Sequence, residues 1–103
     1  MADMSDQDFH LPPPTFEFLI FSLRTQAEMS LRLISFGPEE GEKEPPDFNA
    51  ARHAIDLMAM LVEKTKGNLS LEEQRQLENS LTELRFRFVQ VSDSASKSAA
   101  NES

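Results

Sequence analysis

The segment Thr15–Phe36 has the sequence TFEFLIFSLRTQAEMSLRLISF and is apolar around most of its circumference when it is placed on a helix. One apolar row, interrupted by Ser30, has helical spacing and consists of Phe16, Ile20, Leu23, Ala27 and Ile34. A second apolar group lies on the other side of the helix and consists of Phe18, Phe21 and Met29. A chain of 103 residues can cover only one side of such a helix with its own core. We therefore expect the second group to meet another chain, either a second copy in a homodimer or higher oligomer, or an unidentified protein.

Local sequence signals define the ends of three helices. Thr15 is a good N-cap for the first helix, which should run to about Phe36 and stop at Gly37 and Pro38. The pairs Arg24–Glu28 and Glu28–Arg32 have the i,i+4 spacing of intrahelical ion pairs. Asp47 should cap a second helix over residues 48–66, which ends before Gly67. Ser70 and Glu73 form a capping box for a third helix over residues 71–91.

The short connection between the second and third helices predicts an antiparallel α-hairpin. The third helix has an apolar row with strict 4-3-4-3 spacing, made by Leu77, Leu81, Leu84, Phe88 and Val91. The predicted fold is all-α: a long helix plus an antiparallel α-hairpin, completed by oligomerisation. We predict a disordered N-terminal arm over residues 1–14, a helical domain over residues 15–91 and a disordered C-terminal tail over residues 92–103.

The formal net charge of −8 is concentrated outside the predicted helices. The acidic residues gather in the arm, residues 1–14, and in the loop that covers residues 37–47, whereas the helices carry balanced charge. We favour a solubilising role for these acidic segments, and docking of either one on a partner is the alternative. Binding to nucleic acid would require a clustered basic face, so we expect no nucleic-acid partner.

The chain has few residues that could perform chemistry, and it contains no cysteine. His53 and Asp56 lie one helical turn apart beside Arg52, which allows an alternative function as a small-molecule-binding bundle or an enzyme. A solvated helix surface explains the same three residues, and no nucleophile is evident beside them. We therefore expect no catalytic residues, no cofactor and no metal site.

Six residues are candidates for the expected interface: Phe18, Phe21, Gln26, Met29, Met60 and Phe86. Gln26 could fix the register of two helices by hydrogen bonding, or it could lie at the rim of the contact. A peripheral membrane-surface protein is a further alternative, but the charges on the polar stripe of the first helix are balanced and disfavour it. The longest apolar run in that helix, residues 18–21, is too short to span a bilayer. The N-terminus does not resemble a secretory signal, so we expect a cytoplasmic protein without stable membrane insertion.

Four segments resemble a family of short bacterial proteins known as a domain of unknown function, number eighteen-forty-four. The matching segments are FLIFSLRTQAEM at residues 18–29, PDFNAARHAID at 46–56, LVEKTKGNL at 61–69 and LRFRFV at 84–89. The sequence EKTKGNL, residues 63–69, is the most specific of these motifs. Members of the family tend to end the first helix earlier, at a Leu-Gly pair. The resemblance implies a small, helical, cytoplasmic bacterial protein, and it implies no activity.

Overall fold

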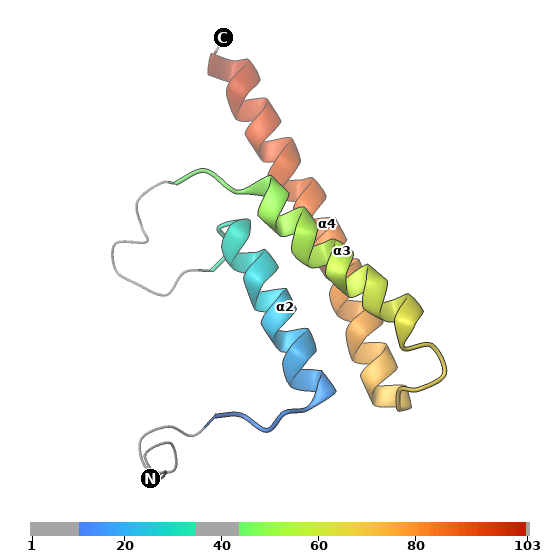
Figure 1. Cartoon of the computed structure of the whole chain (residues 1–103). Coiled ribbons are helices and arrows are strands. Elements are labelled where there is room, and N and C mark those ends of the chain that lie inside the picture. Colours follow the sequence, from blue (N-terminus) through green and yellow to red (C-terminus); the bar gives the residue numbers. More distant parts are fainter. Residues whose placement is uncertain (1–10, 35–43, 103) are drawn as a thin grey trace, which may run out of the picture.

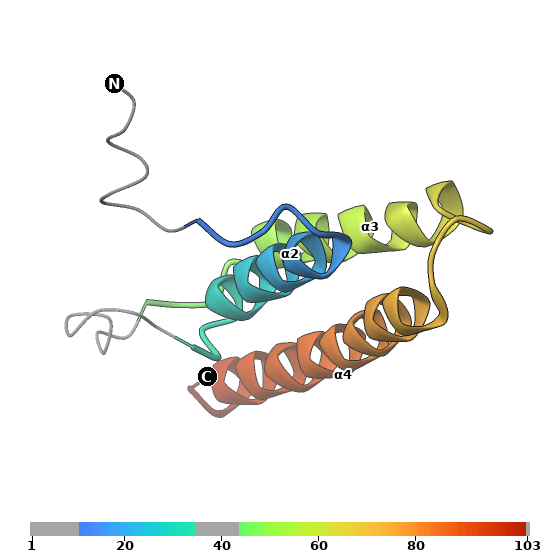
Figure 2. The ribbon, with the colours of Figure 1, turned by 90° about the horizontal axis from the view of Figure 1, so that it is seen from below.

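The computed structural model describes residues 11–34 and 44–102 of the chain (Figure 1). Within these residues there are three α-helices and no strand: α2 (Phe16–Ser30), α3 (Phe48–Lys64) and α4 (Leu71–Glu102). Each helix packs against the other two, and Figure 2 shows α2 beside α3 on one side of α4. Consecutive helices run in opposite directions, so α2 and α4 point the same way (Figure 1). The structure confirms the all-α fold and its α-hairpin, which consists of α3 and α4.

The core lies where one apolar side of each helix meets the other two. The 4-3-4-3 row of α4 points inward, with Leu77, Leu81 and Leu84 buried and Phe88 half-buried. Burial of each large apolar side chain stabilises the fold by roughly 1.5–3 kcal/mol. The buried apolar residues of the other two helices and of the turn after α2 are Ile20, Ala27, Leu31, Ala51, Ala54, Ile55 and Met58.

The helices begin at the predicted capping residues. Thr15 Oγ1 accepts a hydrogen bond from the backbone N–H of Phe18 at 3.0 Å, and Asp47 Oδ1 accepts one from that of Ala50 at 3.0 Å. The capping box at the start of α4 is complete. The backbone N–H of Ser70 donates to Glu73 Oε1 at 2.8 Å, and the backbone N–H of Glu73 donates to Ser70 Oγ at 3.1 Å. These bonds satisfy backbone donors that the first helical turn leaves without a partner.

The first helix ends at Ser30, so the predicted end near Phe36 is wrong. Arg32 adopts the left-handed conformation, with φ of 64°. The backbone N–H of Arg32 donates to the Met29 carbonyl at 3.1 Å, and that of Leu33 donates to the Glu28 carbonyl at 2.9 Å. This pattern is a Schellman motif, which terminates a helix. Phe36 lies outside the described residues.

The early end of α2 changes the contacts of the residues that follow it. Leu31 is buried, whereas Ile34, which the sequence placed on the core row, is half-buried. The predicted Glu28–Arg32 pair is not formed, because Arg32 has left the helix and contacts Glu44 at 3.0 Å. The backbone N–H of Asp47 donates to the Ser30 carbonyl at 2.8 Å and fixes the end of α2 to the start of α3. The earlier end agrees with the pattern that the family resemblance implies.

The third helix continues to Glu102, although the sequence predicted an end at Val91 and a disordered tail. Neither glycine nor proline occurs between Ser92 and Glu102, and alanine within this segment favours a helix. The last turns of α4 extend past the ends of the other two helices (Figure 1). Of the predicted N-terminal arm, residues 11–14 are described and form no helix, and residues 1–10 lie outside the described part of the chain.

A polar cluster that the sequence did not predict connects α2 with α4. Arg24 contacts Glu28 at 3.1 Å, which confirms the predicted pair within α2, and it also contacts Glu83 of α4 at 2.9 Å. Its Nη1 atom lies 3.5 Å from the hydroxyl oxygen of Ser80, the one buried polar residue among those described. These contacts fix the register of α2 against α4.

Candidate interaction surface

The side of α2 that points away from the core carries large exposed apolar side chains, with the half-buried Ser22 and Thr25 between them. Successive residues of a helix are rotated by about 100°, so residues separated by four, three and four positions lie on one line. Phe18, Ser22, Thr25 and Met29 have this spacing, on the side opposite Ile20 and Ala27, which are buried. We call these four residues together with Phe21 the outer stripe of α2.

The aromatic residues of the outer stripe are accessible to a partner. Phe21 is 58% exposed, and Phe18 and Met29 are each 38% exposed. The rings of Phe18 and Phe21 contact each other, with their centroids 6.1 Å apart. Ser22 and Thr25, between the large residues, have small side chains that allow another backbone to come close. The outer stripe contains no charged residue.

The six interface candidates do not form one surface. Phe18, Phe21 and Met29 belong to the outer stripe, and Gln26 is exposed on its rim, beside Met29 and Ser30. Met60 is 41% exposed on α3, two residues from the buried Met58 and therefore on the opposite side of that helix. Phe86 is 60% exposed on α4, two residues from the buried Leu84. The structure thus brings four of the candidates together on α2 and leaves Met60 and Phe86 on the outer sides of the hairpin.

The structure places two residues of the alternative chemical site, Arg52 and Asp56, at one depression, and His53 outside it. Arg52 and Asp56 border a depression of about 230 Å³ between α3 and α4, with Ile55, Arg85, Phe88 and Val89. The guanidinium of Arg52 lies over the Phe88 ring, 5.3 Å from its centroid, which is a cation–π contact. His53 is exposed and does not border this depression. Within the described residues, no three His, Asp or Glu side chains are placed to hold a metal ion.

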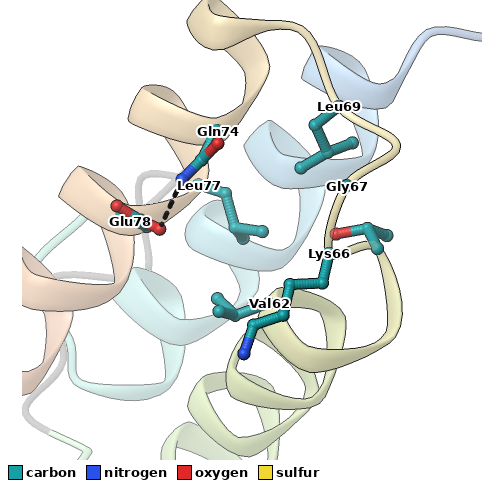
Figure 3. Close-up of a pocket in the computed structure, with 8 residues that line it drawn as sticks. Val62, Lys66, Gly67, Leu69, Gln74, Leu77 and Glu78 are labelled. Carbon is teal, nitrogen blue, oxygen red and sulfur yellow. Dashed lines mark hydrogen bonds between the residues drawn. The ribbon is translucent and has the colours of Figure 1, made fainter.

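The motif EKTKGNL forms the turn of the α-hairpin (Figure 3). Thr65 Oγ1 donates a hydrogen bond to the Leu61 carbonyl at 2.6 Å, and the backbone N–H of Asn68 donates to the Thr65 carbonyl at 2.9 Å. Gly67 has φ of 82°, a conformation that glycine adopts without steric cost. Each of these contacts determines the path of the chain between α3 and α4. The most specific motif of the family therefore has a structural explanation.

A small cavity of about 100 Å³ lies inside this turn. Val62, Leu69 and Leu77 line it with apolar side chains, and Gln74 and Glu78 close one edge through a hydrogen bond of 3.2 Å (Figure 3). The cavity is much smaller than the 300–1,000 Å³ that is usual for small-molecule sites. Its lining fits a packing space of the hairpin rather than a ligand site.

Comparison with known proteins places the chain in a family. The family model described as "Domain of unknown function (DUF1844)" matches residues 13–90, which include α2, α3 and the part of α4 that packs in the bundle. No curated protein and no solved structure shows significant similarity to the chain. Among the described residues, no helix has both the length and the apolar content that crossing a membrane requires. The match covers most of the chain, and the chain therefore belongs to the DUF1844 family.

Proposed function

We propose that this protein is a non-catalytic interaction protein that self-associates through the outer stripe of α2. The observation that carries the proposal is the position of Phe18, Phe21 and Met29, which are exposed on the side of α2 opposite a complete core. Burial of these side chains between two chains would contribute roughly 25 cal/mol for each Å² of apolar surface removed from water. Charged residues, which are depleted at the centres of protein interfaces, do not occur on the stripe.

The surroundings of the stripe support the same function. Arg24 and Glu28, two of the charged residues beside it, are paired with each other, and Arg24 is also paired with Glu83. A partner that covers the stripe therefore does not need to break these ion pairs. The resulting assembly would present two hairpins to other proteins, which suits an adaptor or accessory factor.

Sizing by multi-angle light scattering at micromolar concentrations tests this function. We expect the wild-type chain to be dimeric or larger and Phe21→Glu to be monomeric, because an interfacial carboxylate must lose its hydration without gaining a partner. Met60→Glu is the matched control, since it adds the same charge at an exposed apolar position of α3. Circular dichroism should show both variants folded. A monomeric wild-type chain, or equal effects of the two substitutions, would contradict the proposal.

A further inference from the structure

Four of the five residues of the outer stripe of α2, all except Phe21, have a self-complementary order. From its N-terminal end, the line reads Phe18, Ser22, Thr25 and Met29, so large side chains lie at both ends and small ones in the middle. The midpoint between Phe18 and Met29 is also the midpoint between Ser22 and Thr25, and it falls between residues 23 and 24. A two-fold axis through this point would therefore match every member of the line at once. Such self-complementarity is what a symmetric dimer interface requires.

We infer that the partner of α2 is the α2 of a second copy, packed antiparallel about this axis; the inference rests on the function proposed above. Phe18 then meets Met29 of the partner subunit, and Ser22 meets Thr25 of the partner subunit. Contact of a thioether with an aromatic ring is favourable, and two such contacts occur in the symmetric pair. The small residues in the middle let the helix axes approach to about 8–10 Å.

The residues on the rim of the stripe fit the antiparallel arrangement. In an antiparallel helix pair, each rim faces the same rim of the partner. Leu19 and Gln26 share one rim, and Phe21 and Glu28 share the other. Leu19 thus faces the partner's Gln26, and Phe21 faces the partner's Glu28. The carboxylate of Glu28 is held by Arg24 at 3.1 Å and can remain paired while its methylene groups contact the ring.

The charges at the C-terminal end of α2 favour the antiparallel arrangement over the parallel one. Glu44 is bonded to Arg32 just after this end, and the backbone of Asp47 is bonded to Ser30. A parallel pair would bring two negative helix-dipole ends and two Asp47 carboxylates together, whereas each Glu44 carboxylate is neutralised by its own Arg32. An antiparallel pair places the positive N-terminal end of the partner's α2 beside each negative end instead. The two C-terminal ends are then separated by about the length of α2, roughly 22 Å, which exceeds the Debye length at physiological salt.

Single-cysteine crosslinking tests the arrangement, because the natural chain has no cysteine. The experiment mixes Phe18→Cys with Met29→Cys, oxidises the mixture and separates the linked chains by mass. In the antiparallel pair, residues 18 and 29 of different chains are adjacent, whereas two copies of residue 18 are separated by about 16 Å along the axis. A disulfide requires Cα atoms within about 7 Å, so we expect the mixed product to exceed the Phe18→Cys homodimer about tenfold.

The control and the opposing outcomes separate this geometry from the proposed function. Met60→Cys, on the outer side of α3, measures linkage from random collision when it is mixed with Phe18→Cys. A dimer that links Phe18→Cys mainly to itself, or that gives no mixed product above this background, overturns the antiparallel geometry and leaves self-association intact. A wild-type chain that stays monomeric in light scattering overturns the proposed function and this geometry with it.

Discussion

Among the described residues, Arg32 is the one residue other than glycine whose backbone adopts a left-handed conformation. It holds φ of 64° at the position after the helix cap, where glycine is the usual residue. A left-handed conformation costs a residue with a Cβ atom roughly 1–2 kcal/mol. The Arg32 side chain offsets part of this cost through its contacts with Glu44 and the carbonyl of Pro45. The pair with Glu44 is exposed, and such pairs contribute about 0–1 kcal/mol.

Comparison of two substitutions at this position tests the conformation. Both Arg32→Gly and Arg32→Ala remove the side-chain contacts, so they differ only in the cost of the left-handed backbone. We expect Arg32→Gly to be the more stable of the two by about 1 kcal/mol in urea unfolding. The exposed position Thr82, inside α4, is the control, and there alanine should be more stable than glycine by about 1 kcal/mol. If the alanine variant were more stable than the glycine variant at both positions, the backbone of Arg32 would not be left-handed.

The residues that the sequence predicts well are those whose role depends on close neighbours in the chain. Thr15, Asp47 and Ser70 are caps because each bonds a backbone group three residues away. Ser80 is different: its hydroxyl contacts Arg24, which lies 56 positions away on another helix. The register of α2 against α4 determines that contact, and a local pattern contains no information about it.

At the scale of the elements, the ends of α2 and α4 are the parts that the sequence predicts poorly. Apolar residues continue past Ser30, so the periodic pattern predicts a longer first helix. The chain must nevertheless turn back toward α3, and the bond from Asp47 to the Ser30 carbonyl forms only with the shorter helix. The outer stripe was predictable because it lies opposite the core row of the same helix. The positions of Met60 and Phe86 away from the outer stripe were not predictable, because the packing of the three helices decides which side of each helix remains exposed.

Removal of residues 93–103 tests the extension of α4. Residues 93–97 are exposed, so we expect the truncated chain to unfold with a free energy within about 0.5 kcal/mol of the full chain. The circular dichroism signal at 222 nm should fall by the contribution of the helical residues 93–102. Removal of only the last residue, Ser103, is the control and should change neither quantity. An unchanged helical signal in the long truncation would contradict the extension, and a large loss of stability would show that the segment contacts the bundle.

At the scale of the whole molecule, the distribution of charge separates two kinds of surface. The chain has a net charge of −8, and its outer stripe has no charge at all. A protein with a high net charge stays dispersed because its copies repel one another over distances near the Debye length. An uncharged apolar stripe acts only at contact. The repulsion between acidic copies opposes self-association, and contact between apolar stripes favours it. Salt screens the repulsion but not the apolar contact.

We therefore expect NaCl to strengthen the dimer. Raising the concentration from about 0.05 M to about 0.5 M shortens the Debye length from about 14 Å to about 4 Å and screens the repulsion between the two acidic chains. The proposed contact has no ion pair between chains to lose, and its helix-dipole contacts contribute only about 0.3–1 kcal/mol each. The dissociation constant from sedimentation equilibrium should therefore fall. Asp93→Lys, an exposed position on α4, provides the control, because it lowers the net negative charge away from the outer stripe. It should tighten the dimer at low salt and have little effect at high salt. A dimer that weakens as NaCl rises would instead be held by charged groups, and the uncharged stripe could not be its main contact.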